Sequence, residues 1–130
     1  MDQMKVDGAE NVDGPWWPAG SQWADFSRTE RVRAISAAEL QAVDPERLAA
    51  RWAQIAQLEL HTDNAGNPAM EFDNASIRFV EATDGRGDGL GGIDVDCVDR
   101  DAVLAGAEQR DCVVNDEQVL LGGLRVYLRG

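Results

Sequence analysis

The side chains best suited to chemistry are carboxylates, arginines and one amide that alternate with apolar residues along the predicted strands. Successive residues of a strand point to opposite faces, so these polar residues share one face while their apolar neighbours meet the helices. Six side chains form the predicted ligand-binding set: Glu39, Gln41, Arg78, Asp94, Asp96 and Arg125. One interpretation is a set of ion pairs that brace the sheet, because buried charges need partners. The other leaves an arginine or carboxylate free for a charged ligand, since arginine binds carboxylates and phosphates in a bidentate manner.

No catalytic residue is predicted. The one histidine, His61, lies near a turn with no candidate nucleophile beside it, and a metal site needs about three or four ligands. Cys97 and Cys112 lack the spacing of a metal or redox motif, so we expect small buried thiols. A carboxylate acid/base pair formed by Glu39 and Asp94 stays open, because burial decides their pKa values.

The elements that position these side chains occur twice. Residues 31–84 indicate a strand, a helix and three short strands, and residues 90–130 repeat that order. Asp44 and Asp99 stand at equivalent positions as caps at the start of the two helices. Aligning the halves matches two pairs of positions: Ala37 with Gly92, and Arg78 with Arg125. An internal duplication is the economical explanation.

A glycine-rich stretch, residues 82–92, joins the two halves. Its glycines from Gly87 to Gly92 have the spacing of a dinucleotide loop, but a strand follows where that loop needs a helix, so we interpret the stretch as a connector. Residues 1–30 form an irregular arm that contains Trp16, Trp17 and Trp23. So much apolar surface is costly to leave in water, and we expect the arm to pack on the domain or on a second subunit.

Charge and hydropathy exclude some partners. Twelve basic and twenty-four acidic residues give a formal net charge of −12, which repels nucleic-acid phosphates and suits a cationic or neutral partner. No apolar run approaches the roughly 18 residues that span a bilayer, and the N-terminus lacks the pattern of a secretion signal. We therefore expect no membrane association and a cytoplasmic location.

Three segments together resemble a known superfamily: Val43-Asp44-Pro45 leading into Leu48-Ala49-Ala50-Arg51-Trp52, the run from Ser76 to Gly87, and Gly122-Gly123-Leu124-Arg125-Val126. With the tandem arrangement they resemble the vicinal oxygen chelate superfamily, and in particular bacterial glyoxalase-like domain proteins. The resemblance covers residues from about 32 to 130. It implies an α+β fold in which two βαβββ modules, residues 31–84 and 90–130, form one cupped, mixed and mostly antiparallel sheet.

In metal-dependent members of that superfamily, the first and last strands of each module supply histidine and glutamate ligands. The matching positions here are Ala37, Arg78, Gly92 and Arg125, none of which binds a metal, so we expect no metal and no other cofactor. The resemblance then implies a metal-independent small-molecule binding protein of the bleomycin-resistance type, with a cationic ligand favoured by the acidic charge. The alternatives are a lyase, isomerase or dioxygenase of the same superfamily, or a protein–protein interaction module that uses the tryptophan arm.

The arm also resembles the segment that follows a first glyoxalase-like domain in longer members of the superfamily. A second copy of this chain would replace that neighbour, which predicts a homodimer.

Overall fold

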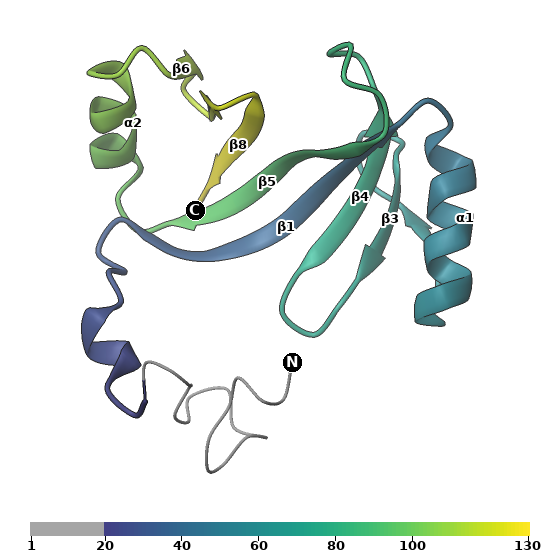
Figure 1. The fold of residues 1–130 in the computed structure, drawn as a ribbon, viewed down its shortest axis with the longest axis horizontal. Coiled ribbons are helices and arrows are strands. Elements are labelled where there is room, and N and C mark those ends of the chain that lie inside the picture. The colour runs from purple at the N-terminus through teal and green to yellow at the C-terminus, as the bar shows by residue number, and fades with distance from the viewer. Residues whose placement is uncertain (1–19) are drawn as a thin grey trace.

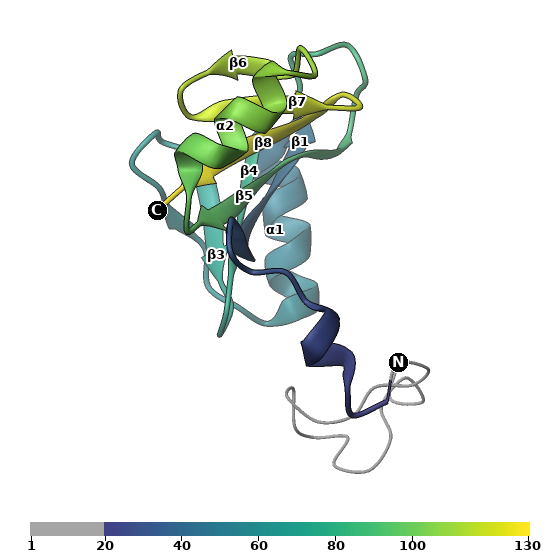
Figure 2. The ribbon, with the colours of Figure 1, turned by 90° about the vertical axis from the view of Figure 1, so that its left-hand side faces the viewer.

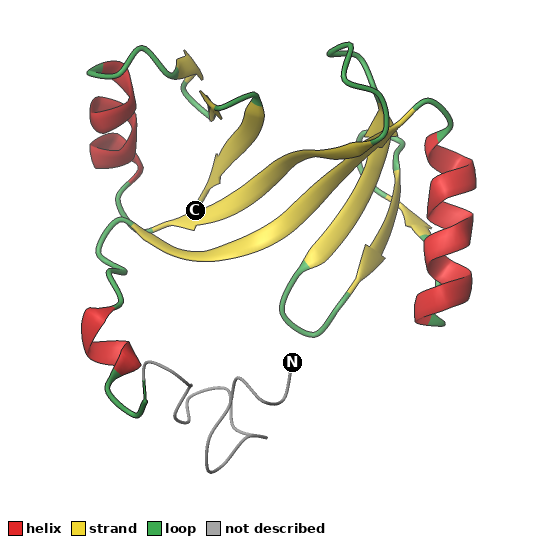
Figure 3. Ribbon diagram, viewed as in Figure 1, coloured by secondary structure: helices red, strands yellow, loops and turns green. Residues whose placement is uncertain are grey.

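Each half of the chain supplies four strands to a single sheet and one helix that packs against it (Figure 1, Figure 3). The computed structural model describes residues 20–130. A 3-10 helix at Trp23–Phe26 comes first. The elements of module one are β1 (Val32–Ala42), α1 (Pro45–Ala56), β2 (His61–Thr62), β3 (Pro68–Glu71) and β4 (Ser76–Glu81). Those of module two are β5 (Gly89–Cys97), α2 (Arg100–Glu108), β6 (Val113–Asn115), β7 (Gln118–Leu121) and β8 (Leu124–Arg129).

The eight strands lie in the order β2-β3-β4-β1-β5-β8-β7-β6. At the centre β1 and β5 pair antiparallel, and β4 and β8 flank them as their parallel partners. The other neighbouring strands are antiparallel. Seen from two sides, the sheet curves and the helices lie outside its two ends, so the face away from them is the inside of a cup (Figure 1, Figure 2). The predicted α+β fold of two βαβββ modules is therefore confirmed.

Equivalent aspartates start the two helices, as the sequence predicts. The carboxylate of Asp44 accepts a hydrogen bond from the backbone N–H of Arg47 at 3.2 Å, and that of Asp99 accepts one from Ala102 at 3.0 Å. Each carboxylate thereby satisfies an N–H that has no partner inside its helix. The helix α1 ends at Gln57, which adopts a left-handed conformation with φ of 56°. Within residues 20–130, no helix has the length and apolar character needed to cross a bilayer.

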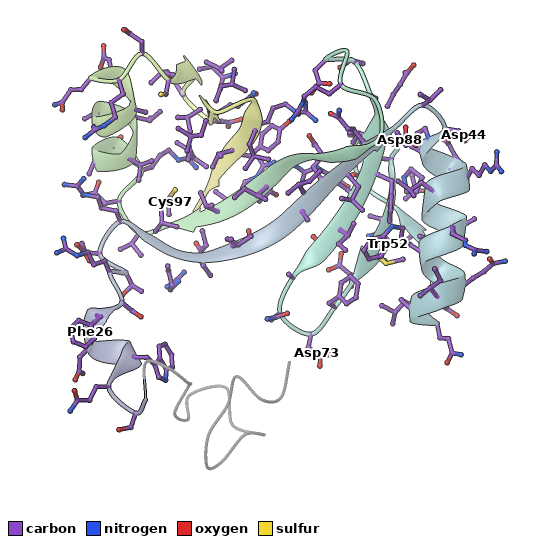
Figure 4. All side chains as sticks on the ribbon, viewed as in Figure 1. Phe26, Asp44, Trp52, Asp73, Asp88 and Cys97 are labelled. Atoms are coloured by element: carbon purple, nitrogen blue, oxygen red, sulfur yellow. The ribbon has the colours of Figure 1, made fainter. Side chains whose placement is uncertain are left out.

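Each helix closes a separate hydrophobic core against its own module. In module one Ala49 packs on Met70 and Phe79, all fully buried, and the Trp52 ring meets the Phe79 ring edge-on at 6.2 Å (Figure 4). In module two the buried residues of the apolar core are Val95, Cys97, Val119, Val126 and Leu128. The two cores lie on the helix side of the sheet, which leaves its concave face to the polar side chains.

The register of the strands reveals how the modules are related. Across β1 and β5, Glu39 pairs with Gly92 and Ala37 with Asp94, which is the exchange expected from a two-fold relation. The same relation does not match Arg78 with Arg125. Glu39 pairs with Arg78, whereas Asp94, the counterpart of Glu39, pairs with Tyr127.

The sequence alignment of the last strands is therefore displaced by two residues, and Tyr127 is the counterpart of Arg78. A shift of two residues keeps every side chain on the same face, so alternation alone does not detect it. The hairpin turns carry the missing signal. Aligning the turn at Asp73-Asn74 with the turn at Gly122-Gly123 gives the register of the structure.

Of the predicted arm, residues 1–19, with Trp16 and Trp17, lie outside the described residues. The Phe26 side chain at the end of the 3-10 helix is 79% exposed. The predicted connector is shorter than expected, because β5 already begins at Gly89. We call its remaining residues, 82–88, the connector loop.

Candidate functional site

The centre of the concave face is Glu39 on β1, one of only three buried polar or charged residues in the described chain. Its carboxylate accepts hydrogen bonds from Arg78 Nε at 2.8 Å, from Arg125 Nε at 3.0 Å and from the Tyr127 hydroxyl at 3.0 Å. One donor comes from β4 of the same module and two come from β8 of the other. The pairing register of the strands therefore brings Glu39 into contact with Arg78 and Arg125, the convergence that the sequence predicts.

A second carboxylate, Asp94 on β5, binds the other edge of Arg78. The Arg78 Nη1 and Nη2 atoms donate to its two oxygens at 3.0 and 2.8 Å, and Arg129 Nε donates at 3.2 Å. Burial opposes the charge of both partners. The hydrogen bonds and opposite charge outweigh it, so the pKa of Asp94 is lowered and that of Arg78 is raised. Both groups are ionised at neutral pH.

The third buried polar residue is Gln41, which is 1% exposed. Its Oε1 accepts a hydrogen bond from Arg125 Nη2 at 3.0 Å. Its Nε2 donates to Asp84 Oδ1 at 2.9 Å and to the Gly87 carbonyl oxygen at 2.8 Å. The connector loop therefore contributes a carboxylate and a carbonyl group to the cup.

Asp96, the sixth predicted residue, lies apart from the other five. On β5 its register partner is Ala34, and its carboxylate pairs with Arg33 Nη2 at 2.6 Å. The Arg33 side chain is 64% exposed, so this pair lies in solvent. Among the described residues no hydrogen bond joins Asp96 to the rest of the set.

Sequence reasoning missed three members of this network: Asp84, Tyr127 in a polar role, and Arg129. The guanidinium groups of Arg78 and Arg129 lie 5.0 and 5.4 Å from the centroid of the Tyr127 ring, within range of cation–π attraction. Burial and the negative charge of Glu39 both raise the pKa of the Tyr127 hydroxyl, which keeps it a donor. Tyr127 lies two residues after Arg125 on β8 and therefore points to the same face of the sheet. This spacing is the sequence signal that would have identified Tyr127.

Two glycines make room for Arg125 to reach across β5. Between the pairs Glu39–Gly92 and Leu40–Leu90 the strand carries one extra residue, Gly91, in a β-bulge. A Cβ on Gly91 would collide with the Arg125 guanidinium, and one on Gly92 would lie 2.9 Å from the Arg125 carbonyl oxygen. Gly92, which the sequence alignment places at a vacant ligand position, therefore has a steric role, and Gly91 beside it has one too.

The residues do not fit the metal of the superfamily's metal-dependent members. The positive charge between Glu39 and Asp94 is the guanidinium of Arg78, which hydrogen-bonds to both. His61 lies far along the sheet on the edge strand β2, 3.5 Å from Glu71. Residues 20–130 contain no group of three histidine, cysteine, aspartate or glutamate side chains arranged to hold a metal ion.

The polar side chains of the cup are paired with one another. No buried side-chain nitrogen or oxygen in the described part of the chain lacks a hydrogen-bond partner. A hollow of about 700 Å³ lies on α1, and its lining includes Arg47, Arg51 and Asp88 of the connector loop. The chemistry available in the cup is therefore recognition by paired charges.

This architecture is the glyoxalase/bleomycin-resistance fold of the vicinal oxygen chelate proteins, and three solved structures share it. Methylmalonyl-CoA epimerase from Mycobacterium tuberculosis is 11% identical, with a TM-score of 0.56 over 81% of this chain and 93% of that one. A hypothetical protein from Bacillus halodurans C-125 is 12% identical, with a TM-score of 0.53 over 75% of this chain and 94% of that one. A methylmalonyl-CoA epimerase in complex with methylmalonyl-CoA and NH4+ is 11% identical, with a TM-score of 0.54 over 76% of this chain and 96% of that one.

These similarities establish the fold. Neither a family model nor a curated protein sequence matches the chain.

Proposed function

We propose that this protein binds a small organic molecule on the concave face of its sheet, without a metal ion. The observation that carries the proposal is the convergence of Arg78 and Arg125, from different modules, on the Glu39 carboxylate at the centre of the sheet, with Arg78 also bound to Asp94. Their side chains are 16% and 18% exposed, so they are ordered by the network yet reachable from the cup. A guanidinium has five N–H groups, and Arg125 uses three in side-chain hydrogen bonds, which leaves donors for a ligand.

The pairing of charges bears on the ligand's charge. Arginine side chains engage each of the carboxylates Glu39, Asp94 and Asp84, so none of these three carboxylates is left unpaired for a cation. The acidic surplus of the whole chain thus gives no local preference for a cationic ligand. The cationic preference stays a prediction that a ligand screen tests.

A thermal-shift screen with equal numbers of cationic, neutral and carboxylate-bearing compounds tests the proposal. A ligand at about 100 times its Kd stabilises a protein by about 2.7 kcal/mol, which such a screen detects. The test variant is Arg125→Gln, and the matched control is Arg33→Gln, whose guanidinium also pairs with an aspartate but in solvent. We expect compounds that stabilise the wild type and the control but not Arg125→Gln. A screen without such compounds, or with hits that tolerate Arg125→Gln, contradicts the proposal.

The epimerase neighbours suggest the alternative, an isomerase of the same superfamily. An isomerase of that kind needs a base that removes a proton, and here the candidates are Glu39 and Asp94. The pKa of Asp94 is lowered, which weakens it as a base. Incubation with methylmalonyl-CoA in deuterium oxide separates the two functions, because an isomerase incorporates deuterium and a binding protein does not.

The division into an arm, residues 1–30, and a domain, residues 31–130, stays a proposal, as do the homodimer and the cytoplasmic location. Phe26, which is 79% exposed, is one apolar side chain that a second copy would cover in the proposed homodimer. In the interaction-module alternative the same surface contacts another protein. Deleting residues 1–30 tests the arm, and a variant that stays folded and dimeric removes its proposed role.

A further inference from the structure

The carboxylate of Asp84 is bound in the cup much as a ligand's carboxylate would be. Its Oδ1 accepts a hydrogen bond from Gln41 Nε2 at 2.9 Å, and its Oδ2 accepts one from Arg125 Nη1 at 3.1 Å. Each oxygen therefore has its own donor from the sheet. Arg86 adds hydrogen bonds from its backbone N–H and its guanidinium, but it belongs to the same loop and moves with Asp84.

The two donors from the sheet do not depend on Asp84 for their position. Gln41 is almost completely buried, and its Oε1 is bound by Arg125. Arg125 is held in turn by Glu39 through its Nε atom. If the carboxylate left, the Gln41 amide and the Arg125 guanidinium would stay in place with an empty position between them.

The loop that carries Asp84 is attached to the domain by few contacts. Gly85 and Gly87 adopt left-handed conformations with φ of 81° and 78°, and a Cβ on either would meet nothing within 4 Å. Apart from the bonds of Asp84, three hydrogen bonds hold the described loop to neighbouring segments: the Ala82 N–H to the Ala42 carbonyl oxygen, Gln41 Nε2 to the Gly87 carbonyl oxygen, and the Val43 N–H to the Asp88 carboxylate. Few contacts, and glycines with open space beside them, are the properties of segments that open at low free-energy cost.

We propose that Asp84 occupies a carboxylate subsite, and that the ligand of this protein is an organic carboxylate that displaces Asp84 and with it the connector loop. The inference rests on the proposed function and specifies its ligand class. A carboxylate fits because the two donors serve two oxygens of one planar group. The loop acts as an internal competitor, so ligands bind less tightly than the subsite alone would allow.

Chemical rescue of the Asp84→Ala variant tests the subsite. Removing the carboxylate leaves donors of Gln41 and Arg125 unpaired, and sodium acetate supplies a replacement. We expect acetate to raise the urea midpoint of Asp84→Ala in a saturable way, beyond the effect of acetamide or of sodium chloride at equal ionic strength. Asp88→Ala is the matched control, because it removes a carboxylate of the same loop that binds only a backbone N–H. We expect acetate to act on this control no more than chloride does.

Equal effects of acetate and chloride on Asp84→Ala overturn the inference. If that variant does not fold, Asp84→Asn serves instead, since its amide keeps the shape but adds donors that face the donors of the sheet. We then expect acetate to stabilise Asp84→Asn in a saturable way and at lower concentration than it stabilises the wild type, and the absence of this tighter binding overturns the inference. Phosphate in a parallel series distinguishes a planar carboxylate subsite from a general anion site, and equal rescue by phosphate contradicts the stated ligand class.

The outcome of the acetate rescue can be distinguished from the outcome of the ligand screen. Rescue by acetate with no wild-type ligand in the screen retains the subsite and removes the proposed function. Wild-type ligands that depend on Arg125 but carry no carboxylate retain the function and remove this inference.

Discussion

Replacing Arg78 by methionine tests whether the paired charges of the cup stabilise the fold. The guanidinium makes three side-chain hydrogen bonds, one to Glu39 and two to Asp94, and its side chain is 16% exposed. Removing one partner of a buried ion pair costs about 3–5 kcal/mol. Because Asp94 keeps Arg129 and Glu39 keeps Arg125, we expect the lower end, about 3 kcal/mol, in urea unfolding at pH 7.

The pH dependence identifies the cause of that loss. Burial alone raises the pKa of Asp94, but the hydrogen bonds and charge of Arg78 hold it below its ordinary value of 3.8. In the wild type, the stabilisation from this carboxylate is complete above pH 3.8 and is lost as the pH falls through the lowered pKa. In Arg78→Met the burial of Asp94 is no longer opposed by Arg78, so we expect the pKa of this carboxyl group to rise. The ionised carboxylate then destabilises the folded state, and its protonation removes that destabilisation. The difference between the two proteins therefore shrinks on acidification.

Arg33→Met is the control, because it makes the same chemical change in a solvent-exposed pair, where about 0–1 kcal/mol is expected. If Arg78→Met costs no more than this control at pH 7, the charges of the cup do not stabilise the sheet. A loss of about 3 kcal/mol that stays constant as the pH falls from 7 to below 3.8 also refutes the electrostatic explanation, since lost packing has no such pH dependence.

Four further predictions concern other parts of the chain. Gly92→Ala destabilises by about 1–3 kcal/mol in urea unfolding, because its Cβ meets the Arg125 carbonyl oxygen. Gly106→Ala in α2, where the Cβ would make only an ordinary contact with Arg110 Nη1 at 3.8 Å, stabilises by up to about 1 kcal/mol. Iodoacetamide modifies Cys112 before Cys97 in peptide mapping, because burial raises the pKa of the Cys97 thiol. The reverse order contradicts the burial of Cys97 in the core of module two. Light scattering at micromolar concentration gives the mass of a dimer, and a monomer mass ends that proposal. Elemental analysis of purified protein finds no stoichiometric zinc, iron or manganese, and finding one refutes metal-independent binding.

The fold could be predicted because its signals are local. Asp44 and Asp99 cap equivalent helices, and short alternating runs separated by turns indicate hairpins. Alternation also assigns Glu39, Arg78 and Asp94 to one face, and antiparallel pairing of the first strands of two modules brings that face together. These inferences need only neighbouring residues and a repeat.

The parts that sequence reasoning missed depend on position along the strands and on the path of a loop. A two-residue shift leaves alternation unchanged, so Arg78 was matched with Arg125 instead of Tyr127. Asp84 meets Gln41 across 43 residues of sequence, through a connector whose course no local pattern indicates. For a residue in such a loop, only the folded chain shows which strand it meets.

The links between modules across the central strands have a consequence for unfolding. Each module has its own apolar core, so the halves would be free to unfold one after the other. Arg125 and Tyr127 of module two donate hydrogen bonds to Glu39 of module one, and Arg78 of module one donates to Asp94 of module two. If either module unfolded, a buried charge of the other module would lose its ion-pair partner, so the network couples the two cores. We infer that the duplicated chain unfolds in one cooperative transition, and that cutting these links creates a half-folded intermediate.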